Sequence, residues 1–101
     1  MENNERVLNL LGLAMRAGKL VTGEEMTLQR VRSGQVKLVV LANDVSESTL
    51  KKMTNKCQSY HTPLISPFNS GEISHAIGKS RRIIGVCDSG FAKKMSDLMK
   101  E

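Results

Sequence analysis

Aromatic residues are scarce in this sequence of 101 residues, which holds one tyrosine, two phenylalanines and no tryptophan. Proteins that read single-stranded nucleic acid on the face of a sheet stack the bases on aromatic side chains. Tyr60, Phe68 and Phe91 are too few to build such a platform. The composition therefore argues against this mode of binding.

Cysteines and long apolar runs are scarce as well. Cys57 and Cys87 are the two cysteines, and two do not make the disulfide framework of a small secreted domain. The apolar stretch from Val7 to Met15 is too short to span a membrane. The first residues are acidic before they are basic, which is unlike a signal peptide. We therefore expect a soluble cytoplasmic protein with reduced thiols and no membrane partner.

The segment Gly78-Lys79-Ser80 looks at first like the end of a phosphate-binding loop. That motif requires a further glycine at a position where this sequence has Ile73. It must also follow a strand and open a helix, whereas here the segment closes a predicted helix and precedes a predicted strand. Nucleotide hydrolysis is therefore not indicated.

Four side chains are of types that bind zinc, but their spacing does not suit a metal site. Cys57 and His61 lie on one predicted helix, far along the chain from His75 and Cys87, whereas zinc ligands usually come in close pairs at loop spacings. Ser74 and His75 are sequence neighbours, which does not make them a nucleophile and its base. We expect no catalytic residue, metal, cofactor or small-molecule substrate, and therefore a binding protein and not an enzyme.

Helical and strand patterns alternate regularly along the chain. Helices are predicted over residues 4–17, from Thr22 to Ser33, over 47–60, in a short segment ending at Gly78, and from Asp88 or Ser89 onward. Strands are predicted at residues 20–21, 37–42, 63–65 and 83–87. The strand at 37–42 is continuously apolar, which is typical of a strand covered on both faces. The pattern predicts one domain over residues 1–101, a three-layer α/β/α sandwich.

Several polar residues stand where helix caps are expected. Thr22 and Glu25 have the spacing of a capping box at the start of the second helix, with Thr22 as its N-cap. Other caps are expected at Asn3 or Asn4, at the pair Asn69 and Glu72, and at Asp88 or Ser89.

On the third helix one face is expected to be buried, comprising Leu50, Met53, Cys57 and Tyr60.

The abundant feature is positive charge. Fifteen lysines and arginines against ten acidic residues give a net charge of +5, which favours a polyanionic partner. Lys79, Arg81 and Arg82 fall within four residues of one another, in a loop that leads into a buried strand. A loop at a sheet end beside a helix N-terminus suits phosphate oxygens. The alternative is that each group of cationic side chains only forms a solvated face of the protein and binds no partner.

Three segments then resemble one known family. They are Gly18-Lys19-Leu20-Val21-Thr22-Gly23, Lys37 to Val45 (KLVVLANDV) and Ile73 to Gly78 (ISHAIG). Their order and spacing resemble the ribosomal protein family of kink-turn RNA binders that includes the L7Ae and L30e proteins, and the whole chain looks like its bacterial YlxQ-like branch. The resemblance implies an α/β/α sandwich with a four-stranded mixed sheet, and binding to structured RNA.

The resemblance also implies where RNA would dock. In the family, the first turn of the second helix enters the RNA groove and contacts sheared G·A pairs, and the loop before the last strand packs over bulged nucleotides. The corresponding candidate RNA-binding residues are Lys19, Thr22, Gly23, Glu24, Glu25, Gln29, Arg30, Asn43, Asp44, Lys79, Ser80, Arg81 and Arg82.

This chain departs from the family pattern at the expected docking site. Of the pattern Gly-Thr-Asn-Glu only Gly23 is retained, with Glu25 in place of the asparagine and Met26 in place of the glutamate. A methionine cannot accept a hydrogen bond from a guanine amino group as a carboxylate does. The last-strand loop has Arg81 and Arg82 where strong binders place small apolar residues. Both changes shift the expected contacts from bases toward phosphates.

We therefore expect a non-enzymatic protein that binds structured, ribosomal RNA, with altered kink-turn specificity. The alternative is a protein-interaction or regulatory adaptor on the same fold. The sequence leaves the oligomeric state open, and a monomer is favoured.

Overall fold

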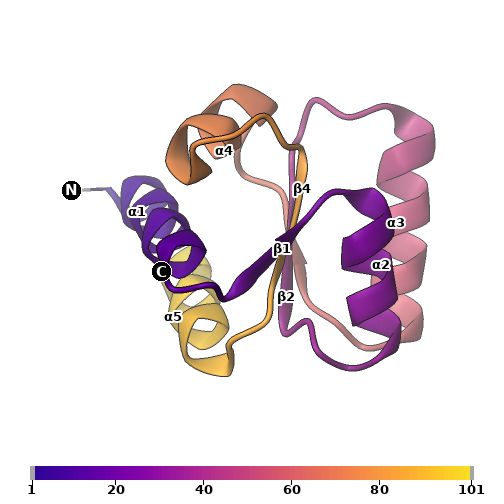
Figure 1. Ribbon diagram of the computed structural model, residues 1–101. Helices are drawn as coiled ribbons and strands as arrows, with labels where there is room; N and C mark the ends of the chain where they lie inside the picture. The colour runs from indigo at the N-terminus through magenta and orange to yellow at the C-terminus, as the bar shows by residue number, and fades with distance from the viewer. Residues whose placement is uncertain (1, 101) are drawn as a thin grey trace.

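One four-stranded sheet organises the protein, whose computed structural model describes residues 2–100. The strand order is β1-β4-β2-β3, and five helices connect and cover the strands within the described residues (Figure 1). The elements are α1 (Asn3–Arg16), β1 (Leu20–Thr22), α2 (Glu24–Arg32), β2 (Leu38–Leu41), α3 (Glu47–Ser59), β3 (Leu64–Ile65), α4 (Ser70–Ile77), β4 (Ile83–Val86) and α5 (Ser89–Lys100). The predicted fold class, including a mixed sheet, is confirmed.

The last strand of the sequence lies inside the sheet. β4 pairs antiparallel with both β1 and β2, so that Thr22 faces Ile84 and Leu41 faces Ile83, while β3 pairs parallel with β2. β1, β2 and β3 therefore end at the edge where β4 begins. We call this the carboxyl-terminal edge, and the opposite one the amino-terminal edge. Loops from distant parts of the sequence meet at each edge.

Helices cover both faces of the sheet, which explains the continuous apolar pattern of its central strands. α1, α4 and α5 pack on one face and α2 with α3 on the other (Figure 1). Every residue of β2 and β4 is buried. No helix within residues 2–100 is long and apolar enough to cross a membrane.

The predicted helix caps are confirmed in α4 and α5 but not in α1. Asn69 and Glu72 form a complete capping box, and the Asp88 carboxylate accepts a hydrogen bond from the Phe91 N–H at 2.8 Å. In α1 the helix already begins at Asn3, so the N-cap position falls on Glu2, whose side chain makes no capping hydrogen bond.

The predicted buried face of α3 is narrower than expected. Met53 and Cys57 are buried, but Leu50 and Tyr60 are each 45% exposed. Only α2 shares this sheet face with α3, so a single row of side chains four residues apart reaches the interior. The exposure of Leu50 and Tyr60 corrects the sequence-based expectation.

Close packing between α2 and the sheet depends on a glycine in the middle of β4. A methyl group at Gly85 would lie 2.8 Å from Val21 Cγ2, 2.9 Å from Val36 Cγ2 and 3.2 Å from Thr27 Cγ2. These are branched side chains on three separate segments, so each can yield only by leaving its preferred χ1 rotamer or by moving its backbone. Gly85 therefore allows α2 to lie close to the sheet, which positions the start of that helix.

We expect Gly85→Ala to lower the free energy of unfolding by about 1–3 kcal/mol, because it overpacks a closed interior. Gly71→Ala is the control, since Gly71 is exposed in the first turn of α4 and its nearest neighbour would be Asn69 Oδ1 at 3.3 Å. Urea titrations of both variants measure the difference. Equal stabilities would contradict this account of the α2–sheet packing.

Candidate nucleic-acid interface

The carboxyl-terminal edge joins the start of α2 to the loop before β4. The Gly23 N–H donates to the Ile83 carbonyl at 2.8 Å, and the Ala42 N–H donates to the Arg82 carbonyl at 2.8 Å. Both bonds follow from the position of β4 between β1 and β2. They hold residues 78–82 between the turn that opens α2 and the turn that follows β2 (Figure 1).

Hydrogen bonds at both ends fix the orientation of Arg81. Its backbone N–H donates to Ser74 Oγ at 3.1 Å, and the Ser74 hydroxyl donates back to the Arg81 carbonyl at 3.1 Å. The guanidinium Nε donates to Thr22 Oγ1 at 3.1 Å. The positive charge of Arg81 is thereby held beside the start of α2.

The predicted capping box of Thr22 and Glu25 is wrong. β1 extends through Thr22, so α2 begins one residue later than such a box requires, and its N-cap is Gly23. Gly23 has φ +90°, a conformation that glycine adopts without strain, and no side chain caps the helix. The Thr22 hydroxyl accepts from Arg81 instead.

The missing side-chain cap leaves hydrogen-bond donors at the surface. The N–H groups of Glu24, Glu25 and Met26 occupy the first three positions of α2, where no carbonyl earlier in the helix can accept them. Such groups attract anions, and the helix dipole adds partial positive charge there. Arg81 adds a full charge beside them.

The two carboxylates of this turn are not equivalent. Glu24 accepts from Lys52 Nζ of α3 at 2.7 Å, so much of its negative charge is compensated. Glu25 is exposed and makes no hydrogen bond to another described residue that would hold it in place. The repulsion expected between this surface and phosphates therefore comes mainly from Glu25.

These side chains surround an open hollow with a volume of about 420 Å³. It is lined by Thr22, Gly23, Glu24, Glu25, Met26, Gln29 and Arg81. Met26 is 43% exposed there, so a thioether forms an apolar part of the wall. The hollow thus offers a cation, amide and carboxylate groups and an apolar surface to one ligand.

Asp44 lies at the same edge but already has partners. Its carboxylate accepts from the Ser70 hydroxyl at 2.7 Å and from the Ser70 N–H at 3.0 Å. The hydroxyl bond is the main cause that lowers the pKa of Asp44 below its usual value, and the positive charge of Arg82 adds to it. Asp44 therefore ties the turn after β2 to the start of α4, while Asn43 stays exposed beside it.

The structure separates two predicted RNA-binding residues from the rest. Lys19 precedes β1, and its carbonyl accepts from the Cys87 N–H at 2.8 Å, at the amino-terminal edge. Arg30 lies in the last turn of α2 and donates to Gln35 Oε1 at 2.8 Å. β1 and α2 each run from one edge toward the other, so residues near each other in sequence end at opposite edges. Lys79, Ser80 and Arg82 are exposed in the loop beside Arg81.

Sequence reasoning missed the functions of Ser74 and Lys52. Ser74 positions Arg81, and Lys52 compensates Glu24. Both contacts join elements distant in the sequence, and no local motif signals them. The Ser74 hydroxyl is thus already hydrogen-bonded to the 78–82 loop.

The cysteines are free thiols within the described chain. Burial raises the pKa of Cys57, and it raises that of Cys87, where the Arg30 guanidinium partly offsets the effect. Both thiols are therefore weakly nucleophilic at neutral pH.

Residues 2–100 contain no group of three or more histidine, cysteine, aspartate or glutamate side chains placed to hold a metal ion.

Comparison with known proteins identifies a family over most of the chain. The profile of the "Ribosomal protein L7Ae/L30e/S12e/Gadd45 family" matches residues 5–96. The RNA-binding protein YlxQ of Enterococcus faecium is 47% identical over 98 residues, covering 97% of this chain and 95% of that protein. YlxQ of Bacillus subtilis is 41% identical over 91 residues, covering 89% and 91%. The resemblance to the YlxQ-like branch is confirmed, and these relatives carry no enzymatic designation, as expected.

Two solved structures are similar to this one. A protein of unknown function from Bacillus halodurans has a TM-score of 0.90 and 46% identity, covering 94% of this chain and 97% of that chain. The 15.5kD RNA binding protein of Giardia lamblia has a TM-score of 0.84 and covers 99% and 87% at 14% identity. The second likeness concerns the fold alone.

We expect Ser74→Ala to loosen the 78–82 loop, because it removes the hydroxyl that bonds both backbone groups of Arg81. The free energy of unfolding should fall by about 1 kcal/mol, and amide hydrogen exchange should accelerate at residues 79–82. Ser80→Ala in the same loop is the control, since no hydrogen bond of the described chain uses the Ser80 hydroxyl. Unchanged exchange in Ser74→Ala would show that the loop is held by its strand pairing alone.

Proposed function

Because the chain belongs to the ribosomal protein L7Ae/L30e/S12e/Gadd45 family, we propose that it is a non-enzymatic protein that binds structured RNA at its carboxyl-terminal edge. Two relatives are named as RNA-binding proteins. The observation that carries the proposal is the position of Arg81, held beside the uncapped first turn of α2.

Phosphate contact is the first part of the proposed interaction. Lys79, Arg81 and Arg82 lie in one loop, and the free N–H groups of α2 point from the same edge. Together they suit the oxygens of one or two adjacent phosphates in a sharply bent backbone. Because Ser74 and Thr22 already hold Arg81, little conformational entropy is lost when it meets an anion.

Contact with base edges is the second part, and we propose that the RNA is of the kink-turn type. The hollow beside α2 presents the Glu25 carboxylate and the Gln29 amide. A carboxylate accepts from guanine N–H groups, and an amide both donates and accepts. Met26 offers only apolar contact. We infer a preference for sheared G·A pairs that is weaker than a full set of polar side chains would give.

The ribosomal association is also a proposal. A relative at 29% identity over 96 residues, covering 88% of this chain and 79% of that protein, is the large ribosomal subunit protein eL30B of Schizosaccharomyces pombe. We propose that this chain acts as a monomer in the cytoplasm on ribosomal RNA. Crosslinking in cells followed by sequencing of the bound RNA tests this directly, and recovery of messenger RNA alone would refute it.

The double variant Arg81→Ala with Arg82→Ala should weaken binding to a kink-turn RNA, because it removes two of the phosphate contacts. For four to six neutralised phosphates, the logarithmic dependence of affinity on salt has a slope of roughly −3 to −5. The variant should flatten this slope by about 1.5. Fluorescence anisotropy at several salt concentrations measures both quantities.

A charge-matched control uses the amino-terminal edge. Lys19→Ala with Arg32→Ala removes two exposed cations that lie away from the proposed interface. This control should retain most of the affinity and nearly the same slope. Equal losses in the two double variants would mean that RNA is attracted by net charge without a defined site.

Glu25→Asn should strengthen binding, because it removes the uncompensated carboxylate and supplies an amide that both donates and accepts. We expect the unsubstituted protein to bind an intact kink-turn roughly tenfold more tightly than a copy with disrupted G·A pairs, which is the size of one good base contact. Glu25→Asn should raise this preference several-fold. Gel shifts with both RNAs measure it, with Glu24→Gln as the control for lost charge at a paired position. If every variant binds both RNAs with the same affinity, the proposed contacts with base edges are refuted.

A further inference from the structure

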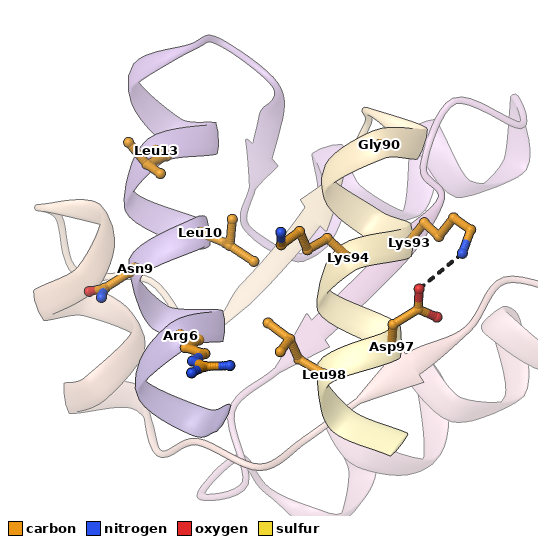
Figure 2. Close-up of a pocket in the computed structure, with 9 residues that line it drawn as sticks. All are labelled: Arg6, Asn9, Leu10, Leu13, Gly90, Lys93, Lys94, Asp97 and Leu98. Atoms are coloured by element: carbon orange, nitrogen blue, oxygen red, sulfur yellow. Dashed lines mark hydrogen bonds and ion pairs between the residues drawn. The ribbon is translucent and has the colours of Figure 1, made fainter. Parts of the chain in front are cut away.

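A second concave surface lies between α1 and α5, on the sheet face opposite to α2. It has a volume of about 720 Å³ and is lined by both helices, which run side by side (Figure 2). We call it the α1–α5 groove. The proposed RNA interface involves neither helix, so a partner in this groove and RNA at the carboxyl-terminal edge do not use the same residues.

The floor of the α1–α5 groove is aliphatic. Leu10 of α1 and Leu98 of α5 point toward each other across it (Figure 2). Leu13 lines the groove one turn further along α1, where it points away from α5 and forms part of the outer wall (Figure 2). Leu13 is 47% exposed and Leu10 is half-buried. Leu13 and the accessible part of Leu10 give the groove an apolar surface that a partner can cover.

The rim of the groove is cationic. Arg6 comes from α1 and Lys94 from α5, and the Lys94 side chain extends across the groove toward α1 (Figure 2). Neither forms an ion pair within residues 2–100, whereas Lys93 is paired with Asp97 at 2.9 Å. The two unpaired cations therefore give the rim an excess of positive charge.

From this combination we propose that the α1–α5 groove binds an acidic amphipathic helix of a partner protein. A groove between two helices accepts a third helix whose apolar residues recur every three or four positions. Acidic side chains beside that apolar row would meet Arg6 of α1 and Lys94 of α5. The two cations thus require negative charge on the partner helix, and the leucines require a row of apolar side chains on it.

RNA fits this surface less well than a helix does. Phosphates would satisfy Arg6 and Lys94 but would leave Leu10 and Leu13 in water. At the N-terminus of α5 the Asp88 carboxylate already accepts from the Phe91 N–H, so it competes with a phosphate there. The groove also lacks an aromatic side chain on which a base would stack.

The test uses a synthetic helical peptide of about 20 residues, a length at which helices become stable. Leucines occupy positions i, i+3 and i+7, and glutamates flank them. A second peptide carries lysines in place of the glutamates. The full-length protein is isotope-labelled and titrated with each peptide, and amide chemical shifts are followed by NMR. We expect the acidic peptide to shift amides of α1 and α5 only, and the basic peptide to bind at least tenfold more weakly.

Two variants of the protein complete the test. Arg6→Glu with Lys94→Glu should reverse the preference in favour of the basic peptide. Leu13→Asp should lower the affinity for both peptides at least tenfold. Because Leu13 is exposed, the fold tolerates this substitution. The control pair Arg32→Glu with Lys51→Glu changes charge equally on the opposite sheet face and should leave binding unchanged.

Three results would overturn the proposal. The first is no binding of the acidic peptide, or binding that ignores the charge reversal. The second is a kink-turn RNA that shifts α1 and α5 amides and competes with the peptide. The third is concentration-dependent dimerisation that Leu13→Asp abolishes, which would assign the groove to a second copy of this chain. None of these results depends on whether RNA binds at the carboxyl-terminal edge.

Discussion

The antiparallel pairing of β4 with both β1 and β2 is the constraint on which the rest of the structure depends. It places the last strand of the sequence inside the sheet, and it brings the loop before that strand against the turns that follow β1 and β2. Gly85 permits α2 to pack closely over this pairing. A cationic loop and a helix start, separated by more than fifty residues, thereby become one surface.

Local electrostatics at this surface differ from what a count of charges suggests. Glu24 is compensated by Lys52, Asp44 is engaged by Ser70, and Arg81 is held by hydroxyl groups and not by a carboxylate. Most of the acidic groups are therefore occupied, while the cations of the loop remain available to a ligand. The net positive charge of the chain acquires a defined location in this way.

Much of the fold could be predicted from the sequence because its signals are local. Continuous apolar runs marked β2 and β4, and the Asn69–Glu72 spacing marked the start of α4. The capping box at Thr22 failed because strand pairing with β4 extends β1 by one residue and leaves Gly23 as the cap. Likewise, Lys19 is close to Thr22 in sequence, but a strand about 10 Å long separates them. Contacts such as Ser74 with Arg81 depend on tertiary structure and leave no local pattern.

The central claim is that RNA docks at the carboxyl-terminal edge, at the first turn of α2 and the 78–82 loop. The most direct measurement is an NMR titration of the isotope-labelled protein with a kink-turn RNA. The account predicts that the largest chemical-shift changes occur at residues 23–29 and 78–82, with little change at Lys19 or on α5. Shifts concentrated at the amino-terminal edge, or spread evenly over all basic residues, would contradict it.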